Sequence, residues 1–197
     1  VWNRSNADTV VSLITNGRAG TSVDIDANGR FVVGLPGADG AWTNTVGARP
    51  LADGQWLGLS SVSGINLGQA VAIDQSLIVI GAPDFNSGSG GVLVYGYSLD
   101  TNAWENPTPF LNPNAEAGDN FGASVDVQGV TMAVGAPGDN AAGGDSGTVY
   151  IYQANPDTSI DQLSFVATDA LAGLLFGRDV DLGGDRMIVG TDSATQS

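Results

Sequence analysis

Cysteine, histidine and lysine are missing from this chain of 197 residues, and its only basic side chains are six arginines. Without cysteine there are no disulfides and no thiol nucleophile, although this leaves the cellular compartment open. Without histidine or lysine, a common general base and an amine nucleophile are also missing. Paired carboxylates could still serve a hydrolase, but no spacing of acids marks such a pair. The chain is therefore predicted not to be an enzyme.

Charge of one sign dominates the chain. It has 21 acidic residues, and its formal net charge is −15. Nucleic acid and anionic membrane surfaces are excluded as partners, because both require basic patches. No run approaches the about 20 apolar residues of a membrane span. The apolar fraction of 42% is that of an ordinary globular protein. The acids therefore indicate either solvated loops or a surface that suits cations or a salty environment.

Glycine-rich repeats organise the chain. Four copies of one pattern place a glycine before two short apolar runs, at intervals of 48, 54 and 55 residues; these glycines are Gly20, Gly68, Gly122 and Gly177. The runs alternate and are bounded by Gly, Pro, Asn and Asp, which is typical of strands. The interval is close to that of a four-stranded propeller blade, roughly 40–50 residues. Such units must stack to bury their apolar faces.

The register of the repeats predicts the fold class, an all-β chain of four-stranded antiparallel blades arranged as a β-propeller. Val1–Arg4 is similar to Val149–Tyr152 and reads as a third strand, with a fourth at Thr9–Ile14. Residues after Gly177 suffice for strands one and two only. We therefore expect one module over 1–197, with three complete blades and one divided between the N- and C-terminal ends. The alternatives are that these ends meet to close a ring, that they pair with other copies, or that the chain is an excerpt of a longer one. The expected units are 1–19 with 175–197, 20–66, 67–120 and 121–174.

Two short motifs within the repeats resemble a known family. Phe121-Gly122 and Gly135-Ala136-Pro137 match the two halves of the FG-GAP repeat, the blade unit of integrin alpha-subunit propellers and of many bacterial and algal extracellular proteins. Gly81-Ala82-Pro83 and Phe176-Gly177 keep one motif each. The resemblance implies a β-propeller, usually of seven blades, in an extracellular or cell-surface protein. Phe121 and Phe176 are expected to pack between adjacent blades.

The resemblance also implies a candidate calcium site, because the family often binds Ca²⁺ in a D-x-D-x-[DN]-G loop. Asp24-Ile25-Asp26-Ala27-Asn28-Gly29 fits the first six positions, and its alternating oxygen ligands suit Ca²⁺. The acid that follows the glycine in the family is replaced here by Val32. We therefore expect a tight hairpin, with a weak cation site on Asp24, Asp26 and Asn28 as the alternative and Ca²⁺ as the candidate cofactor.

Two further acidic sets are candidate metal sites. One follows strand two of each copy, with Asp139 and Asp145 as its best ligands and a polar connection as the alternative; it comprises Asp39, Asp84, Asn86, Asp139, Asn140, Asp145 and Asp192. The other occupies one position of the innermost strands, at Asp24, Asp126 and Asp181, with Ala72 in the second copy. That ring would hold ordered water or a metal, or else each carboxylate would accept hydrogen bonds from nearby backbone N–H groups.

Function is predicted to lie in binding rather than catalysis. The first hypothesis is an extracellular structural or adhesion module that assembles with other copies of itself or with other extracellular proteins, because a half blade leaves strand edges that promote association. The second is a lectin-like module that binds glycans on aromatic platforms, for which the candidates are Trp2, Trp42, Trp56 and Trp104. A hydrolase that uses paired carboxylates is the least favoured.

Overall fold

The computed structural model describes residues 18, 20–44, 54–58 and 64–192, which form four antiparallel sheets and very little helix. The strands of the first two sheets are β1 (Val23–Ile25), β2 (Phe31–Leu35), β3 (Gly40–Asn44) and β4 (Gly54–Gly58), then β5 (Val71–Asp74), β6 (Leu77–Ala82), β7 (Gly91–Ser98), β8 (Ala103–Trp104) and β9 (Thr108–Leu111). The others are β10 (Ser124–Gln128), β11 (Thr131–Ala136), β12 (Thr148–Ala154) and β13 (Ile160–Phe165), then β14 (Asp179–Gly183) and β15 (Arg186–Gly190). A 3₁₀ turn at Pro36–Ala38 and the short α1 (Phe85–Gly88) follow β2 and β6.

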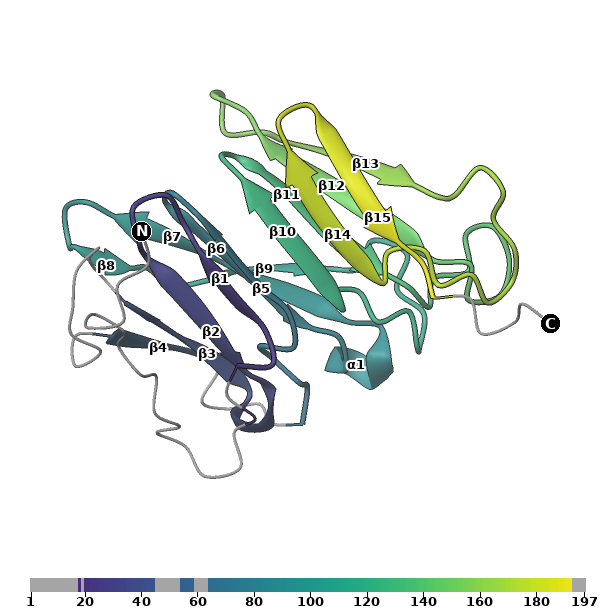
Figure 1. Cartoon of the computed structure of the whole chain (residues 1–197), viewed down its shortest axis with the longest axis horizontal. Helices are drawn as coiled ribbons and strands as arrows, with labels where there is room; N and C mark the ends of the chain where they lie inside the picture. The colour runs from purple at the N-terminus through teal and green to yellow at the C-terminus, as the bar shows by residue number, and fades with distance from the viewer. Residues whose placement is uncertain (1–17, 19, 45–53, 59–63, 193–197) are drawn as a thin grey trace, which may run out of the picture.

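The sheets stand side by side as propeller blades, which confirms the predicted fold class (Figure 1). Within each blade the strands pair in chain order, and the innermost strands β1, β5, β10 and β14 contact one another in turn. We call the face of a blade toward the following blade its front face, and the opposite face its back face. β1 and β14 lie at opposite ends of the row.

The predicted divided blade is described only in its C-terminal half. β14 and β15 form its two inner strands, in a sheet of two among the described residues. Its predicted outer strands fall within residues 1–17, which lie outside the described residues. The four sheets otherwise fall within the four units expected from the repeat.

The outer strand of the second blade is interrupted, a feature that the repeat does not predict. β8 pairs with the end of β7 and β9 with its beginning. Pro107 lies between the two pieces, and proline has no N–H to donate to a ladder. The N–H of Glu105 still reaches the carbonyl of Gly96 at 2.8 Å, so the strand leaves its partner only around the proline.

Adjacent blades meet at paired glycines. The glycine before each innermost strand has a positive φ, for example 91° at Gly122, and its N–H donates to the glycine carbonyl at the end of strand two in its own blade, from Gly122 to Gly135 at 2.9 Å. Its carbonyl points at the preceding blade, where a Cβ on Gly81 would lie 2.0 Å from the oxygen of Gly122. A side chain at Gly81 would therefore force the blades apart.

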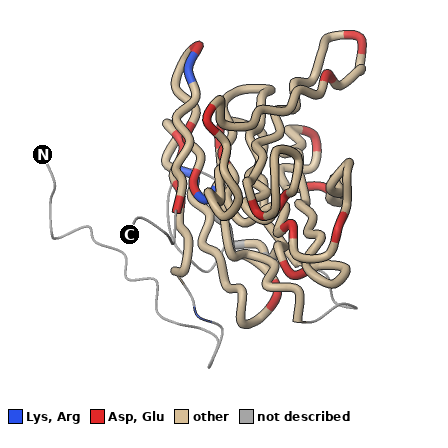
Figure 2. Tube along the Cα trace, turned by 90° about the vertical axis from the view of Figure 1, so that its right-hand side faces the viewer, with Lys and Arg blue, Asp and Glu red and all other residues tan. Residues whose placement is uncertain are grey.

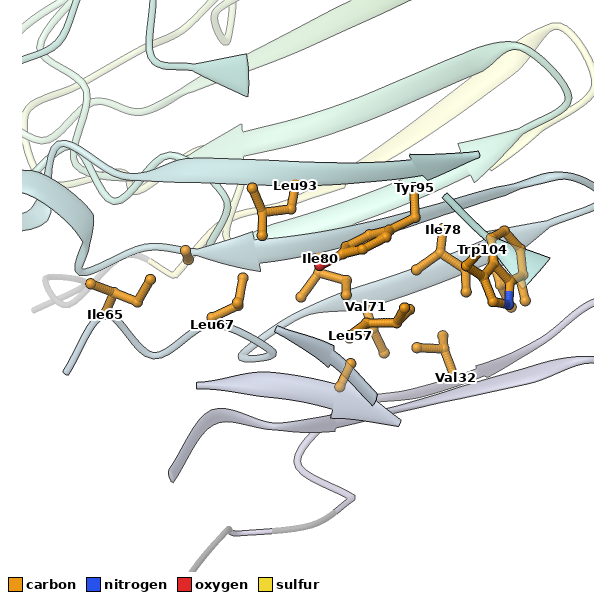
Figure 3. Close-up of a cluster of buried hydrophobic side chains, with 13 residues drawn as sticks. Val32, Leu57, Ile65, Leu67, Val71, Ile78, Ile80, Leu93, Tyr95 and Trp104 are labelled. Carbon is orange, nitrogen blue, oxygen red and sulfur yellow. The ribbon is translucent and has the colours of Figure 1, made fainter. Parts of the chain in front are cut away.

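Apolar side chains fill the space between blades. Between the first and second blades, Val32 and Leu57 from one side meet Val71, Ile80 and Tyr95 from the other (Figure 3). Between the second and third blades, Phe121 is completely buried, and its ring lies 5.5 Å from that of Tyr150. The packing predicted for Phe121 is confirmed. Phe176 packs, partly buried, in the smaller cluster between the third blade and β14–β15.

Replacing Gly81 by alanine should destabilise the chain, because the new Cβ would overlap the carbonyl oxygen of Gly122. Overpacking of this kind costs about 1–3 kcal/mol or more. Gly96→Ala is the matched control, since Gly96 also lies in a strand and has open space around it. Urea unfolding should show a large loss for Gly81→Ala and little change for Gly96→Ala. Equal losses would contradict the proposed role of the glycine contact.

Candidate functional site

The innermost-strand carboxylates bind the next blade. Asp24 Oδ2 accepts a hydrogen bond from the Ile73 N–H at 2.7 Å, and Asp126 Oδ2 accepts one from the Leu182 N–H at 2.5 Å. Each bond joins strand one of a blade to strand one of the blade that follows. Asp181, at the equivalent place in β14, is exposed. The hydrogen-bonding alternative therefore describes Asp24 and Asp126, while metal or water in the ring stays a prediction.

These carboxylates also influence one another. Burial raises the pKa of Asp126 above its ordinary value, the N–H groups of Leu182 and Val127 oppose that shift, and the charges of Asp181 and Asp24 add to it. The carboxylates of the three blades thus lie close enough for their charges to interact. The hydrogen bond from Leu182 compensates part of the cost of keeping Asp126 ionised.

The Asp24–Gly29 segment forms the expected tight hairpin between β1 and β2. Asp26 Oδ1 accepts from the N–H groups of Asn28 and Arg30, both at 2.9 Å. The other oxygen of Asp26 receives the Arg30 guanidinium at 2.8 Å, and the Asp26 side chain is fully buried. Asp24 bonds instead to the second blade. The cation beside Asp26 is therefore the chain's own Arg30.

Arg30 connects this hairpin to the second blade. Its guanidinium carbon lies 5.3 Å from the centre of the Tyr97 ring and 5.7 Å from that of Trp104. Both distances are within the range of cation–π attraction. Sequence reasoning missed Arg30, because nothing in the hairpin indicates an aromatic partner that lies more than 60 positions away.

Among the described residues, the acids that follow strand two in each blade do not share a common site. Those that accept hydrogen bonds each contact a different part of the protein. Asp39 accepts from the N–H groups of Gly64 and Ile65 at 2.7 and 3.1 Å, and Asp84 accepts from the Asn66 side chain. Asp139 is buried, whereas Asp145 and Asp192 are exposed. Figure 2 shows acidic positions scattered over the described chain. Within the described ranges, no three acids group closely enough to hold a metal ion. Cation binding at Asp139 and Asp145 stays a prediction.

A buried polar network surrounds Asp119, which is 1% exposed and was not anticipated from the sequence. Asp119 Oδ2 accepts from the Asn112 side chain at 2.6 Å and from the Glu116 N–H at 2.7 Å, while its Oδ1 is buried without a partner. Nearby, the hydroxyl of Tyr150 donates to Asp139 at 2.6 Å. The only available signal was the position of Asp119, two residues before Phe121-Gly122.

Electrostatics disfavours the charged form of Asp119. Burial raises its pKa, the N–H of Glu116 opposes the shift, the charges of Asp139 and Glu116 add to it, and the Asn112 side chain lowers it. Burial also raises the pKa of the Tyr150 hydroxyl, and its hydrogen bond to Asp139 adds to this effect. The network thus joins Asn112 and Glu116 to a carboxylate whose ionisation is disfavoured by burial.

Of the four candidate tryptophans, Trp104 alone has a described side chain. Trp104 is 3% exposed and its ring packs edge-on against Tyr97 at 5.2 Å, so it presents no face to a sugar. Trp42 and Trp56 lie opposite each other in β3 and β4, where the backbone alone is described. Trp2 lies outside the described residues. The glycan-binding role of these residues stays a prediction that Trp104 does not support.

A small cavity of about 90 Å³ lies beside α1 in the second blade. It is lined by apolar side chains, among them Ile65, Leu67, Phe85, Leu93 and Leu111. No titratable side chain lines it, so it offers neither a general acid nor a general base. The cavity therefore gives no support to the hydrolase alternative.

Both ends of the row of blades expose apolar side chains. At one end Val23 is 65% exposed on the back face of β1, while Val71, its equivalent in the second blade, is 5% exposed. At the other end Ile188 is 71% exposed on the front face of β15, while Ala133, its equivalent in β11, is 0% exposed. Val23 and Ile188 are thus open where their equivalents are covered, although Val33, which pairs with Val23, is buried.

Comparisons with known proteins agree with this fold. Residues 104–152 match the family model described as FG-GAP repeat, from β8 into β12. The crystal structure of Saccharomyces cerevisiae Sqt1, a WD40 propeller, is similar with a TM-score of 0.51 and 16% identity, over 79% of this chain and 38% of Sqt1. This chain thus spans well under half the length of Sqt1, and the likeness shows the fold alone. A search of curated proteins finds no match.

The repeat and the fold together suggest a protein-interaction module. FG-GAP propeller families are generally non-enzymatic, and their repeats are typically extracellular. Within the described part of the chain, no helix is long and apolar enough to cross a membrane.

Replacing Arg30 by methionine should destabilise the chain, because it leaves the buried Asp26 carboxylate without its cation. Breaking a buried ion pair in this way costs roughly 3–5 kcal/mol. Arg186→Met is the matched control, since its contact with Asp185 is 3.8 Å long and both side chains are exposed. Thermal unfolding of the two variants should differ clearly. If calcium rescued Arg30→Met, the hairpin would be a cation site after all.

Replacing Asp119 by asparagine should make stability less dependent on pH. Because folding raises the pKa of Asp119, its contribution to stability is present below the unfolded-state pKa, near 4, and is lost as pH rises through the folded-state pKa. Asparagine stays neutral and can still accept both hydrogen bonds. The free energy of unfolding of Asp119→Asn, relative to the parent, should therefore rise between about pH 4 and pH 7.

The control is Asp119→Ala, which leaves the Asn112 and Glu116 donors without an acceptor and should cost about 1–3 kcal/mol. Urea unfolding at several pH values measures both effects. A constant difference between Asp119→Asn and the parent over this range would show that the carboxylate does not titrate within it.

Proposed function

Because residues 104–152 carry an FG-GAP repeat in a β-propeller fold, we propose that this protein is a non-enzymatic extracellular module that acts through protein–protein assembly, in a structural or adhesive role. The observation that carries the proposal is the exposure of apolar blade faces at both ends of the row. At the equivalent positions of the strands between those ends, a neighbouring blade covers the apolar side chains.

Residues at equivalent positions of the inner blades are buried, which indicates that the exposed residues lack a covering blade in the described part of the chain. Val23 and Ile25 of β1 correspond to Val71 and Ile73 of β5, and to Val125 and Val127 of β10, by their pairing with strand two. The last four are buried against a preceding blade, whereas the first two are exposed. Burying a side chain of this size contributes about 1.5–3 kcal/mol. A partner that covered the end faces would thus gain what the inner blades gain from each other.

The outer part of the third blade is uncovered as well. Phe165 pairs with Val149 as Phe110 pairs with Val92 in the second blade. Phe110 packs against Tyr152 of the following blade at a ring distance of 5.2 Å, whereas Phe165 and its neighbour Leu163 are exposed. The front face of the third blade is therefore covered by β14–β15 near the axis and left open farther out. An assembly partner that supplies outer strands beside β15 would cover it.

If the chain assembles through these faces, the mass of the particle in solution should change when a residue on an end face is replaced. The purified chain should sediment above the 19.9 kDa of one copy, to a degree that rises with concentration. Ile188→Asp should reduce this association, because it places a charge on the uncovered front face. Leu99→Asp is the matched control, since Leu99 is also exposed but directly follows β7 in the second blade, which is not an end blade.

Circular dichroism should show that both variants keep the strand content of the parent. A parent chain that remains at the mass of one copy at every concentration would overturn self-assembly. Equal association of Ile188→Asp and the parent would show that the end face is not the interface.

A further inference from the structure

Every described joint between blades contains a carboxylate that accepts a backbone N–H from the following blade. Asp24 accepts from Ile73 and Asp126 accepts from Leu182. At the joint between them Ala72 occupies the equivalent place, and Asp74 accepts instead from Gly129 at 2.7 Å. Each joint thus has a fixed direction: the carboxylate acceptor lies on the front face of one blade, and the N–H donor belongs to the blade that follows.

The two ends of the row carry the complementary halves of such a joint. Asp181, the equivalent of Asp24 and Asp126, is exposed on β14 and has no hydrogen-bond partner among the described residues. At the opposite end, the Ile25 N–H occupies the place of the Ile73 and Leu182 donors. It bonds to the side chain of its own neighbour, Asp24 Oδ1, at 2.8 Å.

The apolar groups at the two ends are complementary in the same sense. In the inner joints, Val32 on the front face of the first blade packs in one cluster with Val71 and Ile73. Ile188 is the equivalent of Val32, as shown by its pairing with Asp181 where Val32 pairs with Asp24. Val23 and Ile25 are the equivalents of Val71 and Ile73. Among the described residues, Ile188 therefore lacks the apolar neighbours that Val32 has in Val71 and Ile73. Val23 and Ile25 of another copy would supply equivalent neighbours.

From these matching halves we infer that two copies of this chain associate head to tail, with the front face of β14–β15 in one copy against the exposed back face of β1 in the other. Asp181 of one copy accepts the Ile25 N–H of the other in place of Asp24 Oδ1, and Ile188 packs against Val23 and Ile25. This inference rests on the proposed assembly function and names its partner. Because the two surfaces differ, the contact is heterologous, and it builds a ring or a filament rather than a symmetric dimer.

Charge sets the conditions for this contact. Each copy carries a formal charge of −15, so two copies repel each other at low ionic strength. Salt shortens the range of that repulsion to about 8 Å at 0.15 M, while the apolar contact is not weakened. Association should therefore strengthen as salt concentration rises.

Mixing two end-blocked variants tests the polarity of the contact. Ile188→Asp blocks the β14–β15 end and leaves the β1 end intact, whereas Val23→Asp blocks the β1 end alone. Each variant by itself should remain at the mass of one copy, and their mixture should form a complex of one copy of each. Ile188→Ser and Val23→Ser serve as milder versions, and circular dichroism checks that all four are folded.

The outcomes separate this inference from the proposed function. If either variant alone still formed dimers, the contact would be symmetric and the head-to-tail arrangement would be wrong. If the parent associated but the mixture stayed at one copy, assembly would stand and this partner surface would be overturned. If the parent itself never exceeded one copy at any concentration or salt, self-assembly and this inference would both fail.

Asp181 tests the polar half of the contact. Asp181→Ala should weaken association about tenfold or more, because it removes a hydrogen bond to a charged acceptor. Asp185→Ala is the matched control, since it removes one exposed carboxylate from the turn between β14 and β15. Sedimentation at several concentrations measures both dissociation constants. Equal values for the two variants would remove Asp181 from the contact.

Discussion

Contact between glycines at each blade joint is the constraint on which the rest of the structure depends. The carbonyl of Gly122 lies against Gly81, and the carbonyl of Gly177 lies against Gly135 in the same way. This approach brings strand one of a blade within reach of the preceding blade, and only then do the apolar clusters close. The carboxylate bonds of Asp24 and Asp126 span the same joints. Packing and polar contacts between blades therefore both depend on the short distance between the paired glycines, which a side chain on either glycine would prevent.

Acidic residues that look like metal ligands in the sequence are used here to join parts of the chain. Asp26 is neutralised by Arg30, which also reaches Tyr97 and Trp104 of the second blade. Asp139 accepts the hydroxyl of Tyr150, and Asp39 holds the backbone that leads into the second blade. The chain has six arginines, and Asp39, Asp74 and Asp126 accept backbone N–H groups rather than cations. This use of acids keeps the joints specific while the surface stays negative.

The candidate sites were predictable only as far as local geometry determines them. The Asp24–Gly29 hairpin follows from six consecutive residues, so its tight turn could be predicted. The pairing of Asp26 with Arg30 could be suggested only by their closeness in the sequence. The aromatic rings that Arg30 contacts belong to another blade, so the sequence does not indicate them. Asp119 carries no motif of its own, because its burial depends on how the segment from Asn112 folds back beside Asp139. Side-chain contacts between blades, such as that of Arg30 with Tyr97, could not be predicted because no periodic pattern in the sequence indicates them.

Alternation and glycine spacing in the sequence by themselves determined the strands and their antiparallel order within each blade, because these depend on neighbours a few residues apart. The exposure of Val23 and Ile188 was decided by the tertiary structure. Equivalent residues in the repeat have the same local sequence pattern, yet Val71 is buried and Val23 is not. The difference is the presence of a neighbouring blade, and burial is a property of that neighbour rather than of the residue.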